Sequence, residues 1–237
     1  MSTRTLSAAT LIALAATLPF AGTARAAETS PFTANVGLVS DYAYRGWSQT
    51  DEKPALQGGF DYAHDSGLYA GVWGSSVSWL ADADPAISNG LELDLYAGYK
   101  GKVGDIGYDV GLLQYYYPGS YPTGFNSPDT LEGYAAVSWE FLTLKYSYSF
   151  TDLFGFDNSD GSQYLDLSAS YEIADGLKLN AHVGRQYIAG PAESYNDWKI
   201  GVSKSLAGFD IGLHYVDTDV DSKLSDGRVI LSIGRAF

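Results

Sequence analysis

The carboxyl-terminal stretch Val229-Ile-Leu-Ser-Ile-Gly-Arg-Ala-Phe237 decides the fold class of this chain. Apolar residues recur along one face at a period of two, which is the spacing that a β-strand gives to its side chains. This face consists of Val229, Leu231, Ile233 and Phe237. The opposite face carries small or polar residues beside one apolar residue: Arg228, Ile230, Ser232, Gly234 and Ala236. The pattern predicts an amphipathic strand that ends on an aromatic residue.

This ending resembles the closing strand of bacterial outer-membrane β-barrels, in which a terminal phenylalanine and alternating apolar residues are recognised by the barrel-assembly machinery. Arg235 departs from the resemblance, because an aromatic residue is usual at that place. An amphipathic strand at the end of a soluble β-sandwich has a similar pattern. The choice between the two therefore depends on the other end of the chain.

The first 26 residues have the features of a secretory signal peptide. Arg4 supplies a positive charge, residues 6–20 are mostly apolar, and Ala24-Arg25-Ala26 is a small-x-small cleavage site. The apolar run is shorter than the roughly 20 residues of a membrane-spanning helix, and no later window is long enough. We therefore expect residues 1–26 to be removed on export and residues 27–237 to form one barrel domain.

The composition narrows the class further. All 28 acidic residues follow residue 27 and 12 of the 14 basic residues remain after cleavage, so the mature chain has a net charge of −16, which excludes nucleic acid as a partner. The absence of cysteine excludes disulfides and a lipid-bearing amino-terminal cysteine. A hydrophobic content of 46% with a mean hydropathy of −0.09 does not fit a helical membrane protein but fits a barrel, where alternate residues meet lipid. The 19 tyrosines suit lipid–water interfaces.

Alternation of apolar and polar residues continues along the whole mature chain in twelve runs. The clearest run sets Leu91, Leu93 and Leu95 against Glu92, Asp94 and Tyr96. The first run places Tyr42 and Tyr44 on the apolar face and Asp41 and Arg45 on the polar face, and the third run places Tyr69, Trp73, Val77 and Trp79 on one face. The runs cover residues 32–45, 56–62, 68–80, 91–100, 108–112, 131–141, 144–150, 165–172, 177–184, 198–203, 209–215 and 229–237.

The connections between these runs alternate between short and long. Short ones lie at 64–67, 101–107, 141–143, 174–176 and 206–208, and longer ones at 46–54, 81–90, 118–130, 152–161, 189–196 and 217–226. Short periplasmic turns, longer outer loops and an even strand count are the outer-membrane pattern. Because no sheet edge can face lipid, the sheet has to close on itself. We predict an all-β fold, a transmembrane antiparallel up-and-down β-barrel of about 12 strands.

The polar face of the runs is the candidate functional surface, because it encloses the barrel interior. Lys100, Lys145 and Lys178 are expected near the short turns, where they can pair with Glu140, Asp109 or Glu172. Asp41, Asp94 and Asp166 have no basic residue at comparable depth, so we expect them to favour cations or neutral polar solutes. The alternative is a lumen filled by hydrogen-bonded side chains. The candidate pore-lining residues are Asp41, Arg45, Asp61, Glu92, Asp94, Tyr96, Asp109, Glu132, Glu140, Lys145, Asp166, Glu172 and Asp210.

Other motifs in the sequence give weaker evidence for a functional site. Residues 217–221 begin like a calcium loop, but Ser222 stands where that loop needs glycine and Arg228 where it needs glutamate, so no metal site is expected. His182 and His214 face inward near serines, yet no elbow motif or ligand spacing joins them. Tyr115-Tyr-Tyr-Pro-Gly-Ser-Tyr121 and Trp47 suit sugar stacking or interface anchoring. We predict neither an enzyme nor a cofactor.

Four blocks of sequence give a further resemblance. These are Asp41-Tyr-Ala-Tyr-Arg-Gly-Trp-Ser-Gln49, Gly67-Leu-Tyr-Ala-Gly-Val-Trp-Gly-Ser75, Leu91-Glu-Leu-Asp-Leu-Tyr-Ala-Gly-Tyr99, and Tyr108-Asp-Val-Gly followed by Tyr116-Tyr-Pro-Gly119. With them in order, the mature chain resembles the TorF family of porin-like proteins. The resemblance implies an outer-membrane barrel with a transport function, and it implies no substrate.

The sequence therefore predicts a porin-like channel in the outer membrane of a Gram-negative bacterium. It would pass small hydrophilic solutes by diffusion, with a bias to cations or neutral polar solutes. Its expected partners are outer-membrane lipids, the solutes and, through the carboxyl-terminal strand, the barrel-assembly machinery. A closed barrel that acts through its outer loops is the alternative, and an outer-membrane hydrolase is the third.

Overall fold

The computed structural model describes residues 30–237. Nearly all of them belong to one antiparallel sheet that closes on itself. The predicted signal peptide, residues 1–26, lies outside the described residues. No helix within residues 30–237 is long and apolar enough to cross a membrane.

Twelve strands form the barrel wall, and four short strands and one helix lie in the connections. The wall strands are β1 (Phe32–Val39), β4 (Ala55–Ala63), β5 (Leu68–Ser76), β7 (Leu91–Val103), β8 (Ile106–Tyr116), β10 (Thr130–Trp139), β11 (Leu142–Ser149), β12 (Gln163–Ala174), β13 (Leu177–Tyr187), β14 (Tyr195–Leu206), β15 (Phe209–Thr218) and β16 (Arg228–Ala236). The short elements are β2 (Ala43–Tyr44), β3 (Trp47–Ser48), α1 (Trp79–Ala83), β6 (Ser88–Asn89) and β9 (Gly119–Ser120).

The barrel closes between the first and the last strand. β1 pairs with β4 on one side and with β16 on the other, with Gly37 opposite Gly234 in the closing register. Every other wall strand pairs with its neighbours along the chain. The prediction of a closed, antiparallel barrel of about twelve strands is confirmed, and the carboxyl-terminal strand takes the closing place.

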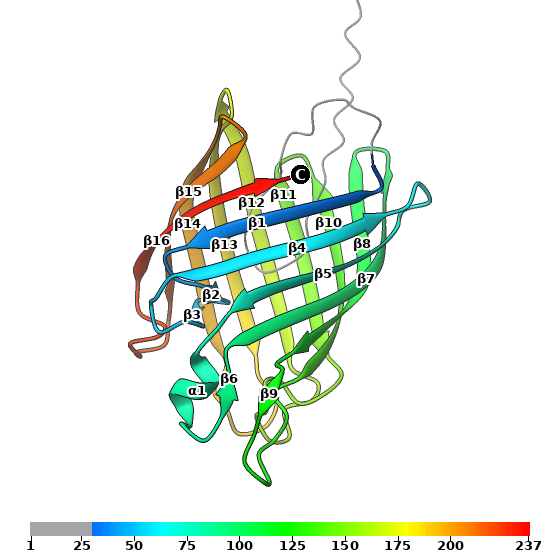
Figure 1. The fold of residues 1–237 in the computed structure, drawn as a ribbon. Coiled ribbons are helices and arrows are strands. Elements are labelled where there is room, and N and C mark those ends of the chain that lie inside the picture. The colour runs from blue at the N-terminus through cyan, green and yellow to red at the C-terminus, as the bar shows by residue number, and fades with distance from the viewer. Residues whose placement is uncertain (1–29) are drawn as a thin grey trace, which may run out of the picture.

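Short turns and long loops separate to the two ends of the barrel, as Figure 1 shows. The short turns between neighbouring strands lie at the end that also holds the carboxyl terminus. The longer connections, residues 40–54, 77–90, 117–129, 150–162, 188–194 and 219–227, gather at the other end with α1, β6 and β9. We call this second end the outer end.

The outward face of the wall is apolar because alternate residues point away from the barrel interior. Leu56, Leu68, Leu95 and Leu213 are examples, each at least half exposed. A continuous exposed apolar surface of this kind marks contact with lipid in a closed barrel. The inward face instead buries polar and charged side chains.

Two predicted faces are wrong. Tyr42 and Tyr44 do not point outward, because β1 ends at Val39 and the chain then turns into the barrel. Tyr69 and Trp73 also face inward, where they are buried, while Leu68 on the other face is exposed. Large aromatic side chains therefore fill part of the interior rather than meeting lipid.

Candidate functional site

The connection between β1 and β4 folds into the barrel as a small hairpin. Its strands are β2 and β3, and Arg45 and Gly46 form the turn between them. The φ angles of these two residues are 45° and 85°, the positive pair that a two-residue type I′ turn requires. We call residues 41–50 the inner hairpin.

The tip of the inner hairpin is held by a buried ion pair. The Arg45 guanidinium donates to both carboxylate oxygens of Glu132 on β10, at 2.9 and 2.7 Å, and to Oε1 of Gln186 on β13, at 2.6 Å. In barrel order β10 is five strands from β1, and β13 is four strands away in the other direction. The inner hairpin therefore crosses the barrel interior.

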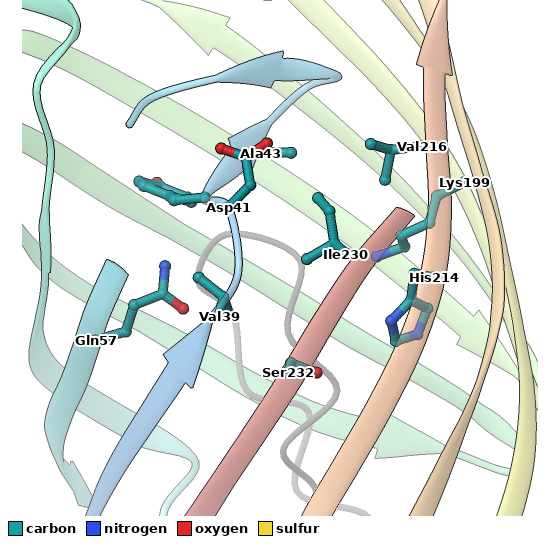
Figure 2. Close-up of a pocket in the computed structure, with 10 residues that line it drawn as sticks. Val39, Asp41, Ala43, Gln57, Lys199, His214, Val216, Ile230 and Ser232 are labelled. Carbon is teal, nitrogen blue, oxygen red and sulfur yellow. The ribbon is translucent and has the colours of Figure 1, made fainter. Parts of the chain in front are cut away.

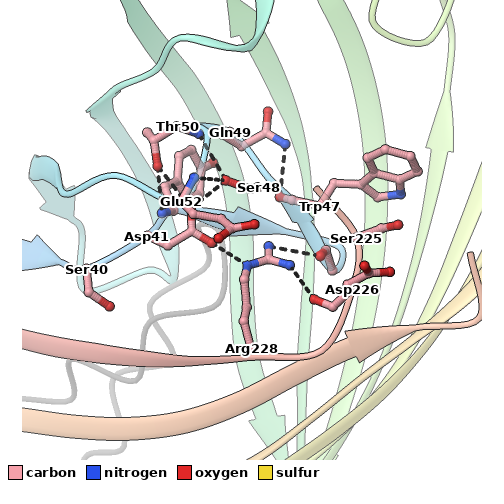
Figure 3. A network of polar contacts seen from close by, with 12 residues as sticks. Ser40, Asp41, Trp47, Ser48, Gln49, Thr50, Glu52, Ser225, Asp226 and Arg228 are labelled. Atoms are coloured by element: carbon pink, nitrogen blue, oxygen red, sulfur yellow. Dashed lines mark hydrogen bonds and ion pairs between the residues drawn. The ribbon is translucent and has the colours of Figure 1, made fainter. Parts of the chain in front are cut away.

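The root of the inner hairpin is tied to the closing strand, as Figure 3 shows. The Asp41 carboxylate accepts hydrogen bonds from Oγ of Ser48 at 2.5 Å, Oγ1 of Thr50 at 3.0 Å and Nε of Arg228 at 2.5 Å. Arg228 also donates to the carbonyl oxygen of Gly46 at 3.1 Å. These bonds join both arms of the hairpin to β16.

Aromatic side chains fix the inner hairpin to the opposite part of the wall. The Tyr42 hydroxyl donates to Glu92 on β7 at 2.8 Å, and the Tyr44 hydroxyl lies 2.7 Å from that of Tyr115 on β8. The Tyr42 ring meets the Trp73 ring edge-on, with centroids 5.6 Å apart. Here the hairpin packs into a buried apolar cluster.

The interior wall has two chemically different parts. β4, β5, β7, β8 and β10 form what we call the acidic wall, and β11 to β16 form the mixed wall. The acidic wall has large aromatic residues and mainly acids, whereas the mixed wall has smaller residues and charges of both signs. Inward charges on the acidic wall are Asp61, Glu92, Asp94, Lys100, Asp109 and Glu132. Those on the mixed wall are Lys145, Asp166, Lys178, Asp197, Lys199, Asp210 and Arg228, with His182 and His214.

A histidine links two acids of the mixed wall. Nε2 of His182 lies 2.7 Å from Asp197, and Nδ1 contacts Asp166. Carboxylate oxygens only accept hydrogen bonds. The two ring nitrogens of His182 can therefore donate to both neighbouring carboxylates only when each nitrogen carries a proton. The Tyr164 hydroxyl donates to Asp197 at 2.9 Å, and its ring lies 4.2 Å from the Arg45 guanidinium carbon. The cluster thus connects the mixed wall to the hairpin tip.

At the outer end, an ion pair joins the β1–β4 connection to the β15–β16 connection. Nζ of Lys223 lies 2.6 Å from Asp51, and Lys53 lies 3.0 Å from the same carboxylate. Hydrogen bonds from Lys223 and then Lys53 lower the pKa of Asp51, and the bond to Asp51 raises the pKa of Lys223. Without the inner hairpin, the six longer connections hold twelve acidic and two basic residues, so the outer end is strongly acidic.

The structure places most of the predicted site residues inside the barrel, but their partners differ from the predicted ones. Asp41 pairs with Arg228 and Asp166 contacts His182, so both have a basic neighbour. Asp94 is 0% exposed, and both its carboxylate oxygens lack a hydrogen-bond partner. Asp61 accepts from Tyr96, and Asp109 accepts from Tyr69.

Three predicted residues lie at the end with the short turns. Glu140 is in the turn after β10 with a φ of 52°, and it is exposed because the strand ends at Trp139. Glu172 is also exposed, and Asp210 is half-buried and accepts from Ser205. Lys145 was expected near a turn but lies inside β11, over the Tyr134 ring. Within residues 30–237 no ion pair joins Lys100, Lys145 or Lys178 to the predicted acids.

Sequence reasoning missed Gln186, Asp197 and Tyr164 as parts of the site. The alternation of each strand places these three side chains on its inward face. Nothing in their sequence spacing, however, indicates that they are neighbours of Arg45. Among the described residues no group of three or more His, Cys, Asp or Glu side chains is arranged to hold a metal ion.

Solved structures with the same fold are outer-membrane porins and channels. The KdgM porin has a TM-score of 0.56 at 7% identity, and the match covers 86% of this chain and 98% of that one. The NanC porin has a TM-score of 0.52 at 12% identity over 86% and 98% of the chains. The COG4313 outer membrane channel from Pseudomonas putida F1 has a TM-score of 0.52 at 15% identity over 89% and 97%. These similarities show the fold alone.

Comparison with curated proteins found no match. A family model described as "Bacterial protein of unknown function (Gcw_chp)" matches residues 23–234. Since this range covers almost the entire chain, the protein belongs to the Gcw_chp family.

Proposed function

We propose that the protein is a porin-like channel of the outer membrane that passes small hydrophilic solutes by passive diffusion, with the inner hairpin as its constriction. The observation that carries the proposal is the Arg45 contact with Glu132 and Gln186, which holds a loop across a closed barrel with a polar interior. A twelve-stranded barrel lies between small barrels filled by side chains and wide porins. A loop held across it leaves a narrow route.

A bias to cations or neutral polar solutes is the second part of the proposal. The excess of acidic residues at the outer end attracts cations to the mouth and repels anions. Inside, Asp41 and Asp166 have basic partners, so they are not free acidic sites of the predicted kind. The acidic residues of the outer end therefore account for the proposed cation bias better than Asp41, Asp94 and Asp166 do.

Planar-bilayer recording tests both parts. We expect discrete conductance steps in KCl, and a reversal potential in a salt gradient that favours K⁺ over Cl⁻. Neutralising exposed acids of the outer end, such as Asp82 and Asp221, should reduce that preference. Absence of conductance contradicts the channel, and an anion-selective reversal potential contradicts the bias.

A closed barrel is the second candidate, and the burial of Asp94 favours it. The side chain of Asp94 is sealed from solvent among the aromatic residues of the acidic wall, so no solute reaches it in this arrangement. A barrel that is closed on every side would act through its outer loops. The same recordings decide between the candidates, because a closed barrel gives no conductance while the hairpin stays in place.

The remaining expectations belong to the proposal. The fold and the apolar outer surface support a place in the outer membrane, with lipids, the solutes and the barrel-assembly machinery as partners. The role we propose is not enzymatic, and the porin and channel names of the structures with the same fold support this part of the proposal. The TorF resemblance stays a prediction, because the family model that matches has another name.

A further inference from the structure

A small pocket lies beside the root of the inner hairpin, between it and the wall strands β4, β1, β16 and β15 (Figure 2). Its cavity volume is about 40 Å³. A water molecule needs about 10–15 Å³ on this measure, so the pocket holds roughly three hydroxyl-sized groups. The pocket is not sealed, so a solute in it can extend into the interior.

Two buried side chains have unfilled hydrogen bonds at this pocket. Gln57 is 3% exposed and its Oε1 has no partner, although its amide nitrogen donates to Ser75 at 3.2 Å. His214 is 5% exposed and its Nε2 has no partner. A buried polar atom without a partner costs free energy, which a ligand that bonds to it recovers.

The two unfilled groups lie at opposite ends of the pocket. Gln57 is on β4 and His214 on β15, and three strand spacings, about 14 Å at the wall, separate these strands. Val39 and Ile230 lie between the two ends and form an apolar strip, as Figure 2 shows. This arrangement suits an extended molecule with hydroxyl groups at its ends and C–H groups between them.

The charged residues of the pocket are already engaged. Asp41 has its three bonds to Ser48, Thr50 and Arg228. Lys199 has the carboxylates of Asp166 and Asp197 as electrostatic partners. The unfilled hydrogen bonds therefore belong to the amide and the imidazole, so the pocket recognises hydroxyl groups better than an ionic group.

We propose that this pocket is a binding site for neutral polyhydroxylated solutes, such as a linear polyol or a monosaccharide, with Gln57 and His214 as its two hydrogen-bonding ends. The physiological meaning of the site rests on the proposed channel function, because binding there places the solute beside the constriction. The site reaches from β4 to the mixed wall beside the root of the hairpin, and Tyr42 of the hairpin is part of its lining.

Saturation-transfer NMR with sorbitol as the probe tests the site on the full mature chain in lipid nanodiscs. We expect saturable binding, and a rise of about 3- to 10-fold in the dissociation constant for Gln57→Met and for His214→Leu. His214→Gln, which keeps a hydrogen-bonding group, should restore most of the affinity. Gln114→Met on β8 and His64→Leu in a turn are matched controls and should bind like the wild type.

The outcomes separate this site from the channel itself. Absence of saturable sorbitol binding, or equal losses in the control variants, overturns the site even when bilayers conduct. Tighter binding of gluconate than of sorbitol also overturns it, because the pocket then selects an anion. Sorbitol binding without any bilayer conductance keeps the site and removes the channel.

Discussion

The acidic wall and the mixed wall have the same strand geometry, but their inward side chains pack differently against the inner hairpin. On the acidic wall, Trp73 and Tyr115 pack against Tyr42 and Tyr44 of the inner hairpin, and Asp94 is fully buried. On the mixed wall, serines, glycines and charged residues leave room for a pocket beside Lys199 and His214. Both walls therefore hold the hairpin, the acidic wall through aromatic packing and Glu132, and the mixed wall through the polar contacts of Gln186 and Arg228, with a pocket left beside them.

This difference shows that the sign of the wall charge does not by itself locate a route for solutes. Asp94, whose carboxylate oxygens have no hydrogen-bond partner, is fully buried where the aromatic side chains pack, so no solute contacts it in this arrangement. A route beside the hairpin has to follow the side chains that are small enough to leave space.

Removing the inner hairpin should have the largest effect of the changes considered, because it removes the element that packs against both walls. Replacing residues 42–50 by a Gly-Ser linker of equal length uncovers the acidic wall, so single-channel conductance should rise several-fold and cation preference should increase. The control is the same replacement of residues 122–126 in an outer connection. Unchanged conductance would show that the hairpin does not limit the route.

Breaking the ion pair at the hairpin tip tests how firmly the acidic wall anchors it. Arg45→Ala should lower the free energy of unfolding by about 3–5 kcal/mol, because Glu132 is left buried without its partner. The double variant with Glu132→Ala should lose much less than the two single losses added together. Urea unfolding in lipid vesicles, followed by tryptophan fluorescence, measures these values, and Lys53→Ala is the exposed control with a change under about 1 kcal/mol. Additive losses would contradict a coupled pair.

Gly46 tests the contact between the hairpin turn and the mixed wall. A Cβ at this position would come 2.2 Å from Thr218 and 2.9 Å from Asp197, and the φ of 85° disfavours other residues. Gly46→Ala should cost about 1–2 kcal/mol from the backbone alone, with an added cost from the collision. Gly124→Ala is the matched control, since its φ is 84° and nothing lies within 4 Å. Equal losses in the same unfolding assay would show that the close approach is unimportant.

The smallest expected effect concerns pH at the outer end. Because the pKa of Asp51 is lowered, its contribution is complete above the ordinary aspartate range and is lost as the pH falls through the lowered value. The raised pKa of Lys223 keeps the pair intact until alkaline pH. We expect the free energy of unfolding, measured as above at a series of pH values, to fall slightly in acid, and Asp51→Asn to remove that component. An identical acid response in Asp51→Asn would assign it to other groups.

The barrel could be predicted from the sequence because an apolar outer face and a polar inner face impose a period of two on a strand. The run from Leu91 to Tyr99 and the run from Val229 to Phe237 kept that period, and both strands lie as expected. The loop positions followed as well, since short and long connections alternate along an up-and-down barrel.

The inner hairpin could not be predicted in the same way. Tyr42 and Tyr44 continue the parity of Leu38, so the period gives no sign that the chain leaves the wall after Val39. The pairing of Arg45 with Glu132 depends on barrel closure, which brings together residues that are far apart in sequence. For the strand with Tyr69 and Trp73, the period places the large aromatic residues on one face but cannot tell the inside from the outside.

The long sequence separation of the hairpin contacts has a consequence for biogenesis. Arg45 lies 87 residues from Glu132 and 141 from Gln186, and Asp41 lies 187 residues from Arg228. The segment is near the start of the chain, yet its partners are in place only once the last strand has arrived, and such non-local contacts form late. The constriction is therefore complete only when β16 pairs with β1. A partly assembled barrel would consequently let more solute leak through than the finished one.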